Sequence, residues 1–135
     1  MNEPVAEGAV AVAQEFYGHI GSGNFDALEE LLAPDLVVHE PRELPYGGEY
    51  HGFAGFLDLT GRLTAVAEVE PASVPKFLDA GDVVAVQMIG RFTSPSSGQS
   101  VETGIVELLS FRDGRIAELD VFYKDPGAVA SLVTG

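Results

Sequence analysis

Two glutamates stand where an acid could move a proton, and Glu40 is the first. It ends the apolar segment 36–40 (LVVHE) and is followed by Pro41, which lacks an amide hydrogen for a strand ladder and bars the residue before it from a helix. A carboxylate at such a strand end can face the interior of a half-open sheet. Loss of water there raises its pKa and makes it a usable proton acceptor. The alternative is a solvated glutamate beside a turn.

Glu107 is the second acid. The alternating segment 105–111 (IVELLSF) places it on one strand face with three large apolar side chains. An acid kept neutral in such surroundings can donate a hydrogen bond to an oxygen that gains negative charge. The alternative is a structural pairing with an interior Arg91 or Gln87, because buried acids are normally paired.

Histidines offer a different base. If Glu40 faces inward, alternation turns His39 outward, to the surface or an interface, whereas a twist at the strand end would make His39 the base. His51 precedes a helix and either lines a pocket mouth or meets water. The histidine spacing is not that of a metal site and the chain has no cysteine, so we expect no metal. Glycine-rich nucleotide motifs are also missing, so we expect no cofactor.

Tyrosines combine an apolar ring with a polar tip that suits a pocket wall. Tyr17 or Tyr123, together with Glu107, is a candidate to stabilise the oxygen that gains charge during catalysis. Tyr46 and Tyr50 flank two glycines in a long loop, which favours either a lid over a pocket or simple anchoring of the loop. Asp120 is a further candidate acid. It ranks below the two glutamates because its apolar neighbours share the opposite strand face.

The amino-acid composition restricts the classes of partner that the chain is expected to bind. The chain has 135 residues and a formal net charge of −14, from 21 acids against 7 lysines and arginines. This charge repels nucleic acids and anionic membranes and favours a small, neutral or cationic, hydrophobic ligand. No stretch approaches the roughly 20 apolar residues of a membrane span, and the start lacks the pattern of a signal peptide. We therefore expect a cytoplasmic protein.

Helical spacing comes first along the chain and strand alternation later. The spacing predicts helices over 4–20, 24–32 (with Asn24 as cap), 53–66 and 126–133, and a short strand over 36–40. Breaks at 80–82, 94–98 and 113–114 divide the remainder into four strands, and Asp113-Gly114 is a strong hairpin signal. These elements form one α+β domain over residues 1–135.

The strands also carry apolar residues that alternation sends outward. These are Val84, Val86, Met88, Val106 and Leu108. An exposed apolar face of this breadth is uncommon in a monomer. We therefore expect a homodimer through the open sheet face.

The order of these elements resembles the nuclear transport factor 2-like fold, especially its ketosteroid isomerase and SnoaL-like polyketide cyclase branch. The segments that carry the resemblance are 15–26, 31–41, 50–52, 111–116 and 123–126. It implies a cone-shaped α+β barrel of the cystatin-like type. Three N-terminal helices would pack on a curved, mostly antiparallel sheet, followed by a short C-terminal helix.

The resemblance also implies roles for individual residues. The general base of the isomerases falls on Glu40 and their hydrogen-bond-donating acid on Glu107, while their oxyanion tyrosine falls on Phe16, one residue before Tyr17. The residues expected to contact substrate are Phe16, Tyr46, Tyr50, His51, Phe56, Gln87, Arg91, Asp120 and Tyr123. The implied activity is cofactor-free isomerisation, cyclisation or dehydration of a small hydrophobic carbonyl or polyketide-like compound. A non-catalytic ligand-binding or assembly module is the alternative.

Overall fold

The computed structural model describes residues 8–134. The helical elements are α1 (Gly8–Ser22), the 3-10 helix η1 (Phe25–Leu31), α2 (Gly52–Val66) and α3 (Pro126–Thr134). The strands are β1 (Leu32–Glu40), β2 (Gly48–His51), β3 (Glu68–Pro71), β4 (Lys76–Asp79), β5 (Val83–Thr93), β6 (Ser100–Arg112) and β7 (Arg115–Tyr123).

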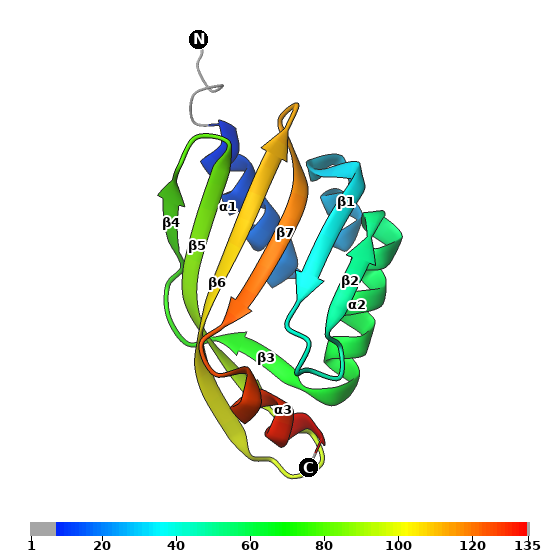
Figure 1. Ribbon diagram of the computed structural model, residues 1–135, viewed down its shortest axis with the longest axis vertical. Coiled ribbons are helices and arrows are strands. Elements are labelled where there is room, and N and C mark those ends of the chain that lie inside the picture. The colour runs from blue at the N-terminus through cyan, green and yellow to red at the C-terminus, as the bar shows by residue number, and fades with distance from the viewer. Residues whose placement is uncertain (1–7, 135) are drawn as a thin grey trace.

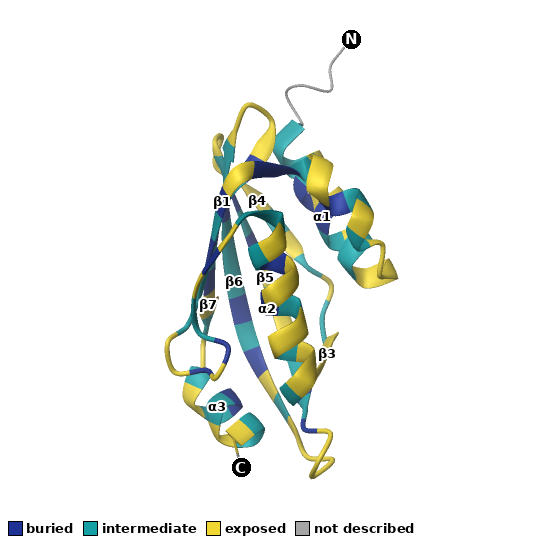
Figure 2. Ribbon diagram, turned by 90° about the vertical axis from the view of Figure 1, so that its right-hand side faces the viewer, coloured by how far each residue is buried: buried dark blue, intermediate teal, exposed yellow. Residues whose placement is uncertain are grey.

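One curved sheet holds every strand (Figure 1). Its order is β2-β1-β7-β6-β5-β3, and β4 pairs with the other part of β5. All pairs are antiparallel except β1 with β7. Helices α1 and α2 cover one face of the sheet, called the inner face here, and α3 lies near one end (Figure 2). The sheet curves around the helices without closing, as the predicted cone-shaped α+β fold requires.

The hydrophobic core lies between the helices and the inner face. Strand alternation sends the even-numbered residues of β5 inward, so Val84 and Val86 are fully buried, with Leu109 of β6 and Val121 of β7 beside them. Helix α1 contributes Phe16 to the same cluster. Residues two apart on each central strand therefore share one enclosed face, which is the face that positions the candidate site.

That alternation corrects one prediction about the outer face. Val84, Val86 and Met88 were expected to point outward, but Val84 and Val86 have no exposed surface and Met88 packs against the core. The side chains that β5 presents on the outer face belong to odd-numbered residues such as Ile89, which is 41% exposed. Val106 and Leu108 do lie on the outer face as expected, since each pairs across strands with an outward residue.

The region around Pro34 differs from the prediction. The expected helix over 24–32 is a 3-10 helix that ends at Leu31, and Asn24 makes no side-chain capping bond. Strand β1 starts at Leu32, and its register against β7 shifts between Leu32 and Val37. A proline can lie within a strand at such an irregularity because no ladder hydrogen bond is required of it there.

Short edge strands account for the other differences. Strand β2 lies in the segment expected to be a loop, and the expected strand before residue 80 is divided into β3 and β4. The hairpin at Asp113-Gly114 is confirmed, with both residues at positive φ (54° and 77°). The expected last helix is confirmed too: the backbone N–H of Ala128 donates to Oδ1 of Asp125 at 3.0 Å.

Among residues 8–134, no helix is long and apolar enough to cross a bilayer.

Candidate active site

Glu40 and Glu107 lie in one row across three neighbouring strands. Glu107 of β6 pairs directly with Val121 of β7. The parallel register of β1 and β7 pairs His39 with Asp120, so one residue further it brings Glu40 level with Val121. Val121 is buried in the core, and residues level with each other on paired strands share a face. Both acids therefore face the inner side, separated by the width of one strand.

Tyr17 reaches this row from helix α1. Its hydroxyl donates a hydrogen bond to Oε1 of Glu107, across 90 residues of sequence. Phe16, which occupies the position of the isomerase tyrosine, is instead a buried core residue whose ring packs edge-on against Tyr17, with centroids 5.1 Å apart. Neighbouring residues on a helix point about 100° apart. The aromatic hydroxyl that contacts Glu107 therefore belongs to Tyr17, the residue after Phe16.

The electrostatics of the two acids follow from their enclosure. Burial, with a smaller contribution from the nearby charge of Glu107, raises the pKa of Glu40 from an ordinary 4.5 to about 8. Burial also raises the pKa of Glu107, and the hydrogen bond from Tyr17 partly opposes that rise. Oε1 of Glu40 is enclosed and has no hydrogen-bond partner in residues 8–134. Such an oxygen is costly to leave unpaired, so it marks a place where a ligand atom would be stabilised.

Two further tyrosines meet at the neighbouring position on β7. Tyr123 lies two residues beyond Val121 on the inner face, and its hydroxyl is 3.0 Å from the hydroxyl of Tyr46. Tyr46 is 1% exposed and comes from the loop after β1. The hydroxyl of Tyr50 donates to the backbone carbonyl of Tyr46 at 2.8 Å. The structure therefore agrees with loop anchoring for Tyr50 rather than with an open lid.

The loop can return to the interior because of Gly47. The Gly47 N–H donates to the carbonyl of Leu44 at 2.9 Å, which closes a tight turn. A Cβ at this position would lie 2.2 Å from the carbonyl oxygen of Pro41, closer than any side chain tolerates. Only glycine fits, and it holds the neighbouring Tyr46 in the core.

His39 lies on the outer face, as alternation predicted when Glu40 faces inward. Its Nε2 is 2.9 Å from Oε2 of Glu118, and its Nδ1 is 3.5 Å from Oε2 of Glu49. Asp120 is level with His39 in the parallel register and shares this face. Neither the alternative base nor the third acid is therefore in the row of Glu40.

Gln87 and Arg91 are also on the outer face, which contradicts their expected place in a pocket. Both are odd-numbered residues of β5, the strand whose even-numbered residues face the core. Arg91 Nη2 lies 2.6 Å from Oε2 of Glu102, and Nη1 lies 2.9 Å from Oε1 of Glu70. An interior pairing of Arg91 with Glu107 is therefore wrong, and Tyr17 takes the position next to that acid.

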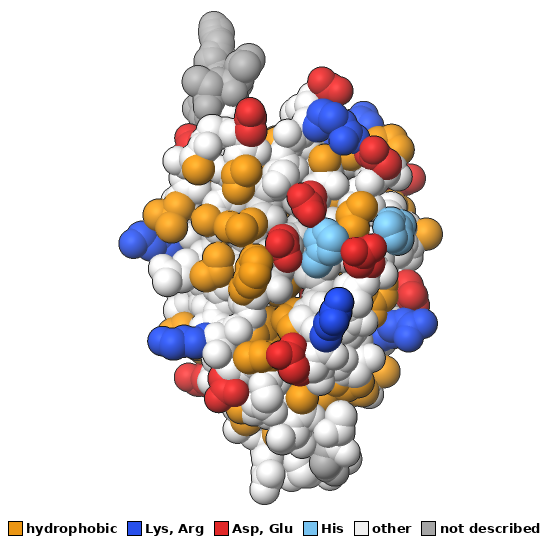
Figure 3. All heavy atoms as spheres, viewed as in Figure 1, with side chains coloured by type: hydrophobic (Ala, Val, Ile, Leu, Met, Phe, Trp, Pro, Cys, Tyr) orange, Lys and Arg blue, Asp and Glu red, His pale blue; other side chains and the backbone are white. Residues whose placement is uncertain are grey.

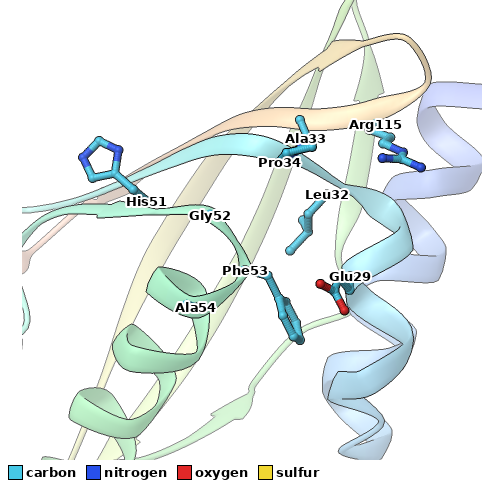
Figure 4. Close-up of a pocket in the computed structure, with 9 residues that line it drawn as sticks. All are labelled: Glu29, Leu32, Ala33, Pro34, His51, Gly52, Phe53, Ala54 and Arg115. Atoms are coloured by element: carbon cyan, nitrogen blue, oxygen red, sulfur yellow. The ribbon is translucent and has the colours of Figure 1, made fainter.

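A surface depression of about 520 Å³ lies at the other end of β1 (Figure 4). Leu32, Phe53 and Glu29 point toward one another there, whereas the ring of His51 points away into solvent. His51 is one of the residues that line this depression, and its side chain is also largely exposed to water. Phe56 lies in the core, with its ring 5.7 Å from that of Phe16. This depression contains neither inner acid, so we place the candidate chemistry in the cone interior.

A smaller depression of about 330 Å³ lies where β1 and β7 end. Glu40 and Tyr123 are among the residues that line it, together with Pro41 and Pro126. It is the surface feature that adjoins the interior row. Within residues 8–134, no group of three or more histidine, aspartate or glutamate side chains is arranged to hold a metal ion.

The sequence did not reveal the two hydroxyl contacts of this site. The Tyr17–Glu107 bond and the Tyr46–Tyr123 pair join residues 90 and 77 positions apart, and they depend on helix rotation and loop path. The only signal available was the presence of tyrosine at each position. The catalytic and binding roles of all these residues remain predictions.

The family model of the SnoaL-like domain matches residues 13–119, which is most of the chain. No curated protein matches the sequence.

Solved structures match almost the whole chain. A nuclear transport factor 2-like protein from Burkholderia xenovorans LB400 has a TM-score of 0.86 at 21% identity, covering 94% of this chain and 96% of its own. TerC, co-crystallised with polyporic acid, has 0.84 at 20% identity, covering 95% and 99%. A candidate polyketide cyclase from Xanthomonas campestris pv. campestris has 0.76 at 20% identity, covering 94% and 97%. At these identities the likeness shows the fold.

Proposed function

Because the chain belongs to the family of SnoaL-like domains, we propose that it takes a small hydrophobic carbonyl or polyketide-like compound into the cone and moves a proton without a cofactor. The observation that carries the proposal is the unpartnered Oε1 of Glu40 in the same cross-strand row as Glu107. The products would be those of isomerisation, cyclisation or dehydration.

Glu40 is the base in this proposal. Its carboxylate takes a proton from the carbon next to the carbonyl group, and the electron pair moves onto the carbonyl oxygen. Glu107, whose pKa is raised by burial, donates a hydrogen bond to that oxygen from its protonated form, and Tyr17 fixes the orientation of Glu107. Glu40 then returns the proton to a different carbon, which completes an isomerisation.

The compared structures support the ligand class and stop short of naming the substrate. TerC was crystallised with polyporic acid, and the Xanthomonas protein is described as a candidate polyketide cyclase. The net charge of −14 on this chain also disfavours large anionic ligands. An apolar compound with a carbonyl oxygen satisfies both observations.

The test is an isomerase assay on cyclohex-3-en-1-one, a small β,γ-unsaturated ketone whose conversion to the conjugated enone is followed by absorbance. Solvent deuterium exchange into acetophenone and related ketones, followed by NMR, extends the test to compounds that do not isomerise. Glu40→Gln should abolish both signals. If neither assay gives a signal with the wild type while the ketones bind, the protein is a ligand-binding module.

We also propose that the outer face pairs with a second copy of the chain. The residues that form an apolar strip across it are Leu78, Ala85, Ile89, Val106, Leu108 and Phe122, and no described element covers them. Acids and histidines border the strip beside β7 and β1, as the space-filling view shows (Figure 3). Lys76 borders the opposite side, where Arg91 is already paired with Glu70 and Glu102. A twofold axis along the strands would bring the acidic border of each copy against the side that carries Lys76.

A further inference from the structure

The Tyr46–Tyr123 hydroxyl pair has a hydrogen to spare. Each tyrosine carries one hydroxyl hydrogen, and the contact between them, 3.0 Å long, uses only one of the two. Neither hydroxyl has another protein partner in residues 8–134. One O–H therefore remains free to donate within the core, and buried donors are normally satisfied.

This pair lies beside the two acids and is distinct from the Tyr17–Glu107 bond. Tyr123 pairs with Ile105 across the strands, so it is the diagonal neighbour of Glu107, which lies two residues further along β6. Diagonal neighbours on paired strands are about 7–8 Å apart at the Cα atoms. Hydrogen-bond donors thus stand at two separate points of one enclosed face, with the unpartnered oxygen of Glu40 in the same neighbourhood.

We infer that the Tyr46–Tyr123 pair is a second oxygen-binding subsite, and that the ligand carries two oxygen acceptors on one short carbon skeleton. This inference rests on the proposed function. One oxygen binds at Glu107 and Tyr17, the other accepts the free hydroxyl hydrogen of the tyrosine pair, and a carbon between the oxygens comes within reach of Glu40. A diketone of one or two rings with a hydrogen on a carbon next to a carbonyl group has this chemistry, whereas a simple monoketone leaves the second donor unpaired.

Contacts with neighbouring residues hold both tyrosines of the subsite in place. Tyr46 is held by the bond from Tyr50 to its carbonyl and by the turn that Gly47 closes. The ring of Tyr123 packs against that of Phe92, with centroids 5.4 Å apart. A donor held in this way loses little freedom when a ligand binds, so it can discriminate between ligands.

The test compares two ketones that differ by one oxygen, 1,4-diacetylbenzene and 4-ethylacetophenone. Dissociation constants are measured for the wild type, Tyr46→Phe, Tyr123→Phe and the double variant. Either single variant leaves one hydroxyl free to donate, so its preference for the diketone should change less than twofold. The double variant should lose that preference by about fivefold, since it removes one net hydrogen bond. Ser94→Ala, which removes a buried hydroxyl elsewhere, should keep it.

A second measurement needs no variant. Infrared spectra of the bound, carbonyl-¹³C-labelled diketone should show both carbonyl bands shifted to lower frequency in the wild type. One unshifted band, or an unchanged preference in a folded double variant, would overturn the subsite. Deuterium exchange with one unshifted band removes the subsite and leaves the proposed catalysis. Two shifted carbonyl bands without deuterium exchange would support the subsite and remove the proposed catalysis. No binding of either ketone at 5 mM removes both.

Discussion

Ionisable side chains have different exposure and different partners on the two faces of the central strands. On the outer face, His39 lies 2.9 Å from Glu118, and Arg91 contacts Glu70 and Glu102, so both side chains have acidic partners at the exposed surface. On the inner face, Glu40 and Glu107 meet apolar residues and tyrosine hydroxyls, without a basic partner among residues 8–134.

A shift of one residue along β1 therefore separates an exposed side chain with acidic partners from an enclosed acid without a basic one. An exposed pair contributes little, because water already solvates both ions. An enclosed acid without a cation keeps its proton to higher pH, which is what proton transfer near neutrality requires. The sequence neighbours His39 and Glu40 lie on opposite faces, so the phase of β1 decides which of them is enclosed.

The largest effect is expected for the inner base. Glu40→Gln keeps the shape and removes the proton acceptor, so turnover on an identified substrate should fall by roughly 100-fold or more while ligand binding survives. Initial rates and dissociation constants measured on the same preparation separate the two. Unchanged turnover would place the base elsewhere and end the contrast between the faces.

The second acid should be sensitive to what replaces it. Glu107→Leu removes the donor and leaves the Tyr17 hydroxyl unpaired, at a cost to the transition state of about 3 kcal/mol. Glu107→Gln should cost less, since its amide still donates to a ligand oxygen and its carbonyl still accepts from Tyr17. The ratio kcat/KM measures both variants. Equal losses would mean that Glu107 acts through its negative charge.

Stability should depend on pH through the inner face. The pKa of Glu40 is about 8 in the folded chain and about 4.5 when unfolded, so between these values the folded state binds more protons. The free energy of unfolding should therefore fall as pH rises through this window, by at most about 1.4 kcal/mol per pH unit for this group. Urea titrations of the wild type and Glu40→Gln check this, because the variant should show a shallower fall.

A substitution on the outer face should change the oligomeric state. Phe122 is 49% exposed and is the residue that β7 contributes to the apolar strip, so Phe122→Glu should convert a dimer to a monomer without altering turnover per chain. Light scattering gives the mass of each form. Glu68→Gln, an exposed change on the edge strand β3, is the matched control and should remain dimeric. A monomeric wild type at micromolar concentration would remove the dimer.

The smallest effect is expected for His39→Gln. Its partners are exposed acids on the outer face, so the variant should lose less than about 1 kcal/mol of stability and keep its turnover within twofold. Thermal melts and initial rates test both expectations. A loss of turnover comparable to that of Glu40→Gln would show that the two faces cooperate in the chemistry.

Local patterns in the sequence predicted a large part of the fold. The hairpin at Asp113-Gly114 and the Asp125 cap depend on neighbouring residues and were found correctly. The phase of β6 was also readable, because Glu107 alternates with apolar residues on a long strand. The wrong phase for Val84 and Val86 arose because every residue from 83 to 86 is apolar, so alternation was invisible there.

The site was less predictable because it depends on contacts between distant segments. Whether Tyr17 or Phe16 reaches Glu107 depends on the rotation of α1 against the sheet, which the helix sequence does not specify. The placement of Tyr46 depends on a loop whose path is fixed by Gly47. Arg91 was expected inside because a buried acid usually needs a cation, and here a tyrosine takes that position.

The irregular start of β1 affects how this protein could change during evolution. A slip of one residue in a regular strand turns every later side chain to the other face. In β1 the pairing with β7 is interrupted between Leu32 and Val37, while its last residues are paired on both sides, by β2 and by β7. An inserted or deleted residue near Pro34 would be absorbed in that interruption. The chain can therefore vary in length before the site while Glu40 keeps facing the interior.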